Sequence, residues 1–177
     1  MNKREKGFSL IELLIVVAII LIIAAIAIPN LLRSRMAANE ASAVGSVRTI
    51  NTAQVTYNST YNDGFSTTLA TLGGAAGVAA SCNNAELIDP LLTAGQKTGY
   101  TFAVQAGTVA VTVQPAGCAN PGDVDGYTVT AVPVNVGTTG QRSFCSDGSG
   151  VIQFLATGGA PPLAPPICGA GMSALGN

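Results

Sequence analysis

The sequence predicts an α+β protein in which one long N-terminal helix packs on an antiparallel sheet of about four strands. An apolar run and a following stretch with apolar residues at spacings of three or four together cover about Ser9 to Tyr61. Segments rich in β-branched residues, separated by turn-forming residues, then occupy the second half of the chain. One helix followed by a group of strands is the order expected of an α+β domain.

The first half of the expected helix is apolar on all sides. Residues 13–28 carry no polar side chain, and only Ser9 and Glu12 interrupt the run that begins at Phe8. A helix from Phe8 to Ile28 reaches roughly 30 Å at about 1.5 Å per residue, which is enough to cross a bilayer core. Basic residues precede the run, and they favour a cytoplasmic N-terminus with the rest of the chain translocated.

Glu12 is the charged side chain inside this run that needs an explanation. A carboxylate in lipid costs about 2.5–3.5 kcal/mol at mid-membrane on insertion scales, so a specific partner is expected. A secretory signal peptide cleaved after Ala27 and a plain membrane anchor with Glu12 reaching the interface are two interpretations of the run. Neither gives Glu12 a purpose.

A third interpretation accounts for all of these residues. The block KGFSLIELLIVVAII at residues 6–20 resembles the class III leader of type IV pilins and pseudopilins. The resemblance implies that a prepilin peptidase cuts after Gly7 and N-methylates the new first residue, Phe8. It also makes Glu12 the family's glutamate and Pro29 its helix-kink proline. The resemblance is specific over residues 6–30 and looser beyond, and it implies the pilin fold.

Simple electrostatics supports the same role for Glu12. Cleavage after Gly7 creates an α-ammonium group on Phe8, one helical turn from Glu12. In a staggered bundle the amine of one subunit can meet the carboxylate of a neighbour, which gains about 4 kcal/mol at about 4 Å and an effective dielectric near 20, before desolvation. Misaligned subunits would leave the charges unpaired. Glu12 and Phe8 are therefore expected to set the register of assembly.

Four segments are expected along the chain. Residues 1–7 form a leader that is removed, 8–30 a transmembrane and filament-core helix, 31–61 its amphipathic continuation, and 62–177 a globular head with disulfides. The apolar stripe of the continuation consists of Val44, Val47, Ile50, Ala53, Tyr57 and Tyr61.

The head is expected to contain a connecting loop, four strand regions and an irregular tail. The loop covers residues 66–99 with one short helix at 85–92. The strand regions are 100–106 and 108–114, paired as a hairpin, then 127–136, and then 142–146 with 151–155 around a turn at 147–150. Residues 156–177 are rich in Gly, Ala and Pro and are expected to be irregular.

The cysteines all follow the apolar run, on the side predicted to be oxidising, so their even number predicts two disulfides. Three connectivities are possible, and sequence alone does not choose among them. We favour Cys82–Cys118 and Cys145–Cys168, because the second bond would hold a tail that has little else to fix it. The spacing of the cysteines and the absence of histidine from the sequence argue against a zinc site.

The composition excludes several kinds of chemistry. Without histidine there is no Ser-His-Asp or Cys-His arrangement, and no glycine-rich segment ends as a P-loop does, so we expect neither an enzyme nor a cofactor. Beyond Tyr61 two basic residues stand against six acidic ones, which argues against a general nucleic-acid surface. Asp123 and Asp125 resemble part of a calcium loop but lack its other carboxylates, and remain weak metal candidates.

The expected function is that of a structural subunit, of major pilin type, in a type IV pilus. Its partners would be further copies in a helical filament, prepilin peptidase and the inner-membrane assembly machinery. The subunit would span the inner membrane with its head in the periplasm before entering an extracellular pilus. The close alternative is a major pseudopilin in the periplasmic pseudopilus of a type II secretion system. The more distant one is a monomeric, membrane-anchored binding or adhesive protein.

Overall fold

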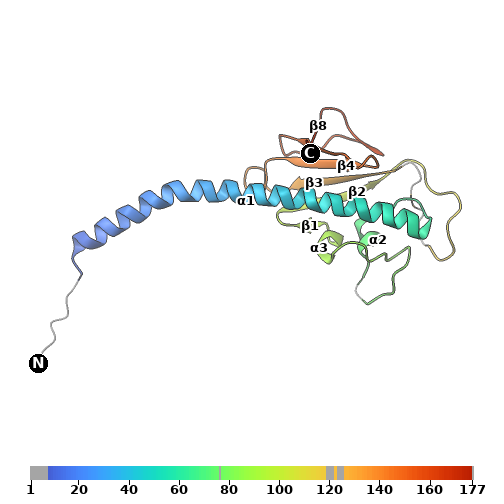
Figure 1. The fold of residues 1–177 in the computed structure, drawn as a ribbon, viewed down its shortest axis with the longest axis horizontal. Coiled ribbons are helices and arrows are strands. Elements are labelled where there is room, and N and C mark those ends of the chain that lie inside the picture. Colours follow the sequence, from blue (N-terminus) through green and yellow to red (C-terminus); the bar gives the residue numbers. More distant parts are fainter. Residues whose placement is uncertain (1–7, 76, 119–121, 123–125, 177) are drawn as a thin grey trace, which may run out of the picture. The chain divides into compact units, whose positions relative to one another are not determined.

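The computed structural model describes residues 8–75, 77–118, 122 and 126–176 (Figure 1). The chain divides into two compact units, Met1–Arg35 and Met36–Asn177, which are described separately. Helix α1, Leu10–Tyr61, contributes its first half to the first unit and its second half to the second. The helix predicted from about Ser9 to Tyr61 is therefore confirmed.

In the first unit, α1 is helical throughout and its apolar side chains are exposed. Pro29 lies inside the helix, and the side-chain amide of Asn30 donates to the carbonyl of Ile26 at 3.1 Å. Because proline lacks an N–H, a helix containing it leaves one backbone carbonyl in the preceding turn without its usual donor. The kink at Pro29 stays a prediction.

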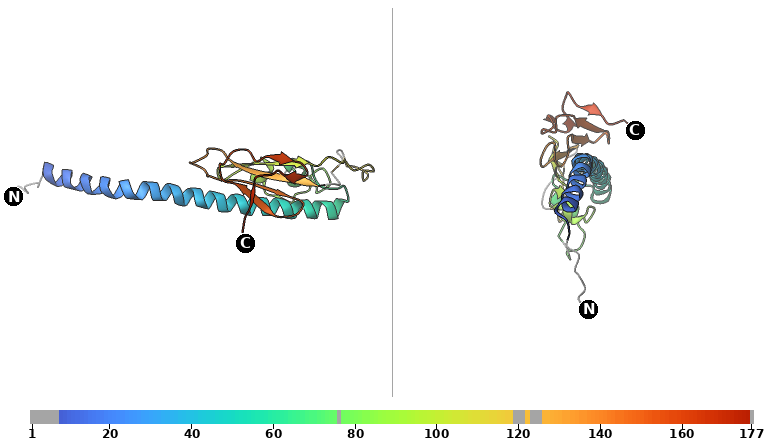
Figure 2. Two further views of the ribbon diagram at one scale, coloured as in Figure 1. Left: turned by 90° about the horizontal axis from the view of Figure 1, so that it is seen from above. Right: turned by 90° about the vertical axis from the view of Figure 1, so that its left-hand side faces the viewer.

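In the second unit, α1 has one buried face. The apolar stripe expected from the sequence supplies much of it, with Val44 and Tyr61 partly buried at its edges. The buried apolar residues of α1 are Ala43, Val47, Ile50, Ala53 and Tyr57. This face packs in one hydrophobic core with side chains from the sheet, which lies alongside α1 in this unit (Figure 2).

The sheet has six antiparallel strands in the order β1-β2-β3-β4-β5-β8. The long strands lie in the middle and two-residue strands at both edges. The strands are β1 Gln96–Lys97, β2 Tyr100–Ala106, β3 Tyr127–Pro133, β4 Ser143–Asp147, β5 Ile152–Leu155 and β8 Ser173–Ala174. The antiparallel sheet packed on a long helix confirms the predicted α+β class.

Alternate residues of the central strands face opposite sides of the sheet. Phe144 pairs with Ala131, and both are fully buried on the side that packs against α1. Cys145 pairs with Thr130 on the opposite side, where both are also buried. Strand β3 is thus buried on both of its faces, unlike a strand in a sheet that has one face exposed to solvent.

The C-terminal region supplies the cover on the second face. Strands β6, Leu163–Ala164, and β7, Ile167–Cys168, form a two-stranded antiparallel sheet, and β7 contacts β3 and β4. Strand β8 then adds to the main sheet beside β5. The tail expected to be irregular therefore contains three short strands: β6 and β7 form the hairpin whose strand β7 covers the far face of β3 and β4, and β8 extends the main sheet.

Two local expectations were wrong. Residues 108–114 form no strand; β2 pairs along its whole length with β3, and residues 107–126 connect the two. The connecting region holds two short helices, α2 Leu69–Gly73 and α3 Pro90–Thr93, in place of one at 85–92. The carboxylate of Asp89 caps α3 by accepting from the N–H groups of Leu91 and Leu92, so Asp89-Pro90 marks the start of this helix.

Candidate processing and assembly site

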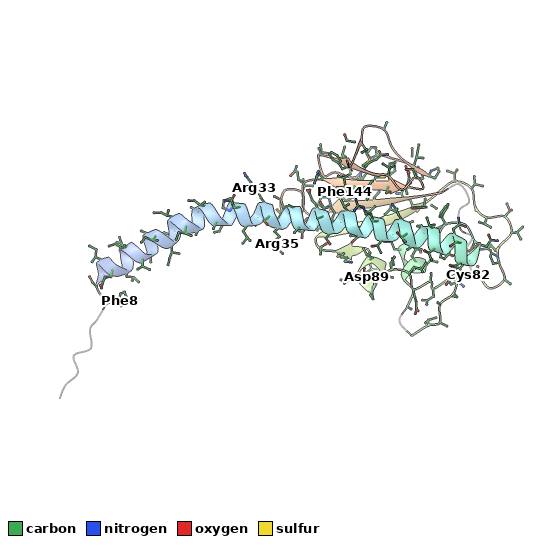
Figure 3. The ribbon with its side chains drawn as sticks, viewed as in Figure 1. Phe8, Arg33, Arg35, Cys82, Asp89 and Phe144 are labelled. Atoms are coloured by element: carbon green, nitrogen blue, oxygen red, sulfur yellow. A yellow bond between two sulfur atoms is a disulfide. The ribbon has the colours of Figure 1, made fainter. Side chains whose placement is uncertain are left out.

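The candidate site lies at the start of α1, where Phe8 precedes the helix (Figure 3). Ser9 stands at the N-cap position, and its carbonyl accepts from the N–H of Leu13 at 3.2 Å. The Glu12 carboxylate reaches back and accepts from the backbone N–H of Ser9 at 2.9 Å through Oε2. This is one of the two bonds of a capping box. The Ser-x-x-Glu pattern at residues 9–12 is the sequence signal for this cap, and the sequence analysis did not include it.

The other oxygen of Glu12 is free to bind a further donor. Oε1 has no hydrogen-bond partner among the described residues, and the side chain is exposed. The neighbouring apolar side chains are exposed as well, with Phe8 at 83% and Leu10 at 81%. One oxygen of the Glu12 carboxylate can thus accept a further hydrogen bond, on a helix whose apolar side chains are exposed. Gly7, the predicted cleavage position, lies outside the described residues.

A second group of residues fixes α1 to the head. Glu40 is 8% exposed, and Oε1 accepts from the backbone N–H groups of Gln141 and Arg142 at 2.8 and 3.1 Å. Oε2 accepts from Nε of Arg142 at 2.8 Å and forms an ion pair with its Nη2 at 2.7 Å. Burial raises the pKa of Glu40, but these hydrogen bonds and the Arg142 charge outweigh burial and lower the pKa below its usual 4.5.

The guanidinium of Arg142 is itself held in place. It lies 5.8 Å from the ring centroid of Phe144 and 5.4 Å from that of Phe154. A guanidinium over an aromatic face is attracted by the ring quadrupole. Sequence reasoning missed this group, although Glu40 stands on the buried face three residues before Ala43, where a charge needs a partner.

Further polar contacts follow along the same helix. The Asn51 side-chain amide donates to Oγ of Ser146 at 2.8 Å. The Gln54 amide exchanges two hydrogen bonds of 2.8 Å with the backbone of Ser66. The Tyr57 hydroxyl donates to the carbonyl of Cys82 at 2.7 Å, and burial, followed by the nearby charge of Asp63, raises the pKa of Tyr57 to about 12. The buried helix face is therefore joined to the head by specific as well as apolar contacts.

The cysteines form two disulfides, the pairing that the sequence analysis favoured. Cys82 is bonded to Cys118 across the connecting regions, and Cys145 of β4 is bonded to Cys168 of β7. Asp147 supports the second junction because Oδ2 accepts from the N–H of Cys168 at 3.1 Å. The C-terminal hairpin is thus held on the far face of the sheet by a covalent bond and a buried carboxylate.

The candidate metal residues cannot be placed. Asp123 and Asp125 lie outside the described residues. Within the described ranges, no group of three or more His, Cys, Asp or Glu side chains is arranged to hold a metal ion.

The structure has a pilin-like α+β fold, with a long N-terminal helix packed on an antiparallel sheet and a head that contains two disulfides. The start of the helix is apolar and exposed, and it carries a single carboxylate. Helix α1 is long and apolar enough to cross a membrane. The family model described as the prokaryotic N-terminal methylation motif matches residues 2–28.

Two curated relatives match the chain. The type IV major pilin protein PilA of Myxococcus xanthus is 47% identical over 56 residues, which is 32% of this chain and 26% of that protein. The type IV wide pilus major component PilA4 of Thermus thermophilus is 63% identical over 38 residues, which is 22% of this chain and 29% of that protein. The matches thus span less than a third of each relative. No solved structure matches.

The chain therefore carries the N-terminal methylation motif of the class III prepilin leader, and over less than a third of its length it is homologous to type IV major pilins. The homology is to structural proteins, in agreement with the expectation that the chain is not an enzyme.

Proposed function

We propose that this chain is a major-type subunit of a type IV pilus. Prepilin peptidase cuts after Gly7 and methylates Phe8, and the mature subunits assemble through their N-terminal helices. The observation that carries the proposal is the exposed apolar half of α1 with Glu12 near its start, inside the region matched by the methylation motif.

The exposed surface of this half-helix supports a membrane state followed by a filament state. In lipid, the apolar side chains are already in an apolar environment, so leaving the membrane is driven by close packing and by satisfied polar groups more than by hydrophobic transfer. A bundle of such helices supplies packing, and the amine of Phe8 on a neighbouring subunit supplies the counter-charge for Glu12.

The capping geometry is compatible with that pairing. Glu12 uses Oε2 for the N–H of Ser9 in its own helix, which leaves Oε1 for the amine of a neighbour. An ionised carboxylate has about four acceptor positions on its two oxygens. The same side chain can therefore begin its own helix and set the register of the next subunit.

Under this proposal residues 1–7 are the removed leader, residues 8–30 the membrane and filament-core segment, residues 31–61 the amphipathic continuation of the helix, and residues 62–177 the globular head. Before assembly the head lies in the periplasm, where its two disulfides are stable. After assembly the head faces outward from an extracellular filament.

The N-terminus of the mature protein tests the proposal. Mass spectrometry of the mature chain should find N-methylated Phe8 as the first residue. A plain anchor would retain Met1, and a secretory signal peptide cut after Ala27 would give Ile28. Electron microscopy of material sheared from cells then distinguishes the two filament types. A surface pilus should be found in the sheared material, whereas a type II secretion subunit would form a periplasmic pseudopilus.

A further inference from the structure

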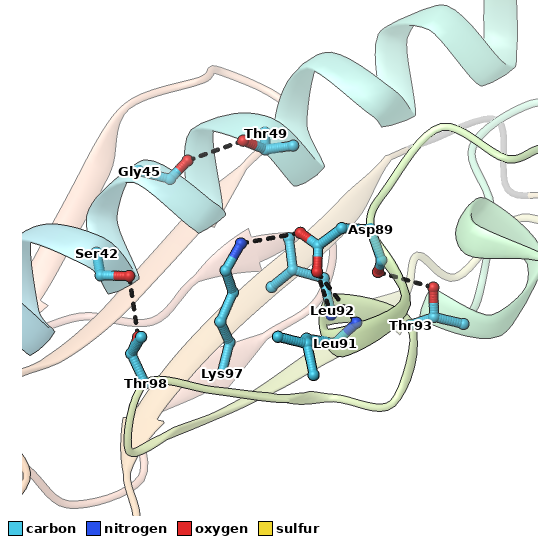
Figure 4. Close-up of polar contacts among 9 residues, drawn as sticks. All are labelled: Ser42, Gly45, Thr49, Asp89, Leu91, Leu92, Thr93, Lys97 and Thr98. Carbon is cyan, nitrogen blue, oxygen red and sulfur yellow. Dashed lines mark hydrogen bonds and ion pairs between the residues drawn. The ribbon is translucent and has the colours of Figure 1, made fainter.

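The second unit, Met36–Asn177, has two exposed charged side chains, of opposite sign, without an ion pair among the residues that the structure describes. They are Arg48 on α1 and Glu86 before α3. The other exposed or partly exposed charges described in this unit have partners: Lys97 pairs with Asp89 at 2.9 Å (Figure 4), and Arg142 pairs with Glu40. Because the other surface charges described in this unit are paired within it, these two are available for a contact outside the subunit.

Arg48 lies between two adjoining grooves, one lined mainly by apolar surface and the other mainly by polar surface. Arg48 and Leu175 line both grooves, which have volumes of about 350 and 340 Å³. Val44 and Gly45 of α1 line one groove, and Ile152 of β5 lines the other. A Cβ built on Gly45 would meet no atom within 4 Å, so the helix surface there is open. This surface, the Arg48 surface, therefore combines apolar side chains with the Arg48 cation; the Glu40–Arg142 ion pair also lines one of its grooves.

Glu86 lies in a third groove, on the side of the head that carries α2 and α3. The groove has a volume of about 450 Å³, and Ile88 and Pro90 form part of its wall. Leu91, next to Pro90 on α3, is 60% exposed. This second surface, the Glu86 surface, combines one anion with exposed apolar side chains.

The two surfaces lie at opposite edges of the head. Helix α3 packs beside β1, at one edge of the six-stranded order, while Ile152 and Leu175 belong to the region of β5 and β8 at the other edge (Figure 1). One copy cannot bring its own two surfaces together. A contact between them has to join two copies, and an interface between different surfaces propagates along a series of subunits unless it closes into a ring.

We propose that the Arg48 surface of one copy binds the Glu86 surface of the next, with Arg48 and Glu86 forming an ion pair across the interface. The proposal rests on the proposed function, because it names the contact between heads that accompanies packing of the helices. The pair is of opposite sign, and both members lie beside apolar walls that the contact would cover. Complementary charges at such a contact select one register and disfavour others.

Cysteine crosslinking between copies tests the contact directly in the full-length chain, assembled by its own host. Arg48→Cys and Glu86→Cys are placed in two separately tagged copies that are expressed together. The four native cysteines are in disulfides and do not compete. After mild oxidation, a dimer that carries both tags is expected on a non-reducing gel. Ser59→Cys, at another exposed position of α1, replaces Arg48→Cys as the control and should give no such dimer.

Charge reversal supplies an independent readout. Arg48→Glu and Glu86→Arg should each lower the yield of sheared filaments by about tenfold, because each places like charges opposite one another. The double variant R48E/E86R should restore the yield. Both residues are exposed and form no ion pair with the residues that the structure describes, so folding and methylation of Phe8 should be unchanged in every variant.

Two results would overturn the contact. One is wild-type filament formation by the cysteine-bearing copies without a mixed dimer; the other is a double reversal that assembles no better than the single ones. Both are distinguishable from failure of the proposed function, in which the wild-type chain would have an unmethylated N-terminus and no filaments.

Discussion

The carboxylate of Glu12 and the backbone N–H of Ser9 are joined by a hydrogen bond of 2.9 Å within one helix. Glu12 thus has a local role, helix capping, besides the proposed role of pairing with a neighbouring amine. A substitution that removes both roles cannot separate them. The amide of glutamine can accept the same bond without carrying charge.

We therefore expect Glu12→Gln and Glu12→Ala to assemble equally poorly, while both still insert in the membrane. The yield of sheared filaments and the membrane-bound fraction are the measurements. If the glutamine variant gave wild-type yield, capping rather than charge pairing would be the function of Glu12. Glu12→Asp is the matched control, because it keeps the charge on a side chain shorter by one methylene group.

Gly7→Ala should block cleavage of the leader. The chain would then keep residues 1–7, Phe8 would have no free amine, and Glu12 would lose its proposed counter-charge. Mass spectrometry of the membrane fraction should find the uncleaved chain. Recovery of a mature protein that begins at Phe8 from this variant would contradict the cleavage model.

Glu40→Ala should destabilise the head. The substitution leaves the N–H groups of Gln141 and Arg142 without their acceptor, which costs about 1–3 kcal/mol of unfolding free energy. Thermal melting of the detergent-solubilised full chain, followed by near-UV circular dichroism, measures the loss. Glu86→Ala, at an exposed and unpaired position, should change the stability by less than about 0.5 kcal/mol.

The stability of the head should fall at acidic pH. Hydrogen bonds lower the pKa of Glu40 from 4.5 and that of Asp147 from 3.8, in spite of burial, which acts in the opposite direction. A carboxyl group whose pKa is lower in the folded than in the unfolded state stabilises the folded protein at pH values above its unfolded-state pKa. That stabilisation is lost as the pH falls through the folded-state pKa. Melting temperature should therefore be steady at neutral pH and decline below about pH 4.5. Glu40→Gln should make that decline shallower.

Removal of the Cys145–Cys168 bond should release the C-terminal hairpin. Closing a loop with a sequence separation of 23 stabilises the folded state by about 3 kcal/mol in the chain-entropy model. Cys145→Ala with Cys168→Ala should lower the unfolding free energy by about that amount and expose the tail to limited proteolysis. The pair Cys82→Ala with Cys118→Ala is the comparison, and it should leave the C-terminal segment protected.

The features that the sequence predicts well are those with a local pattern. Helix α1 was predicted within one residue at each end because its apolar run and its stripe both repeat at helical spacing. The leader block is recognised from adjacent residues alone. The β4–β5 hairpin was also predicted, since a glycine-rich turn separates two short β-branched or aromatic segments.

Features that depend on distant partners were not predicted. Residues 108–114 have strand-like composition, but β2 pairs with β3 instead, because pairing depends on which strand completes a buried sheet. The strands of the tail are two residues long and depend on distant partners: β7 contacts β3 and β4, and β8 pairs with β5. The bonds of Glu40 connect residues about 100 positions apart, beyond any local pattern.

The contacts between α1 and the head would have a mechanical consequence in the proposed filament. They lie in a row along the helix, at Glu40, Asn51, Gln54 and Tyr57. Tension along α1 would load this row in shear, so the hydrogen bonds and the ion pair would share the force instead of opening one after another. A subunit anchored in this way could carry tension from its N-terminal helix into its head without the two sliding apart.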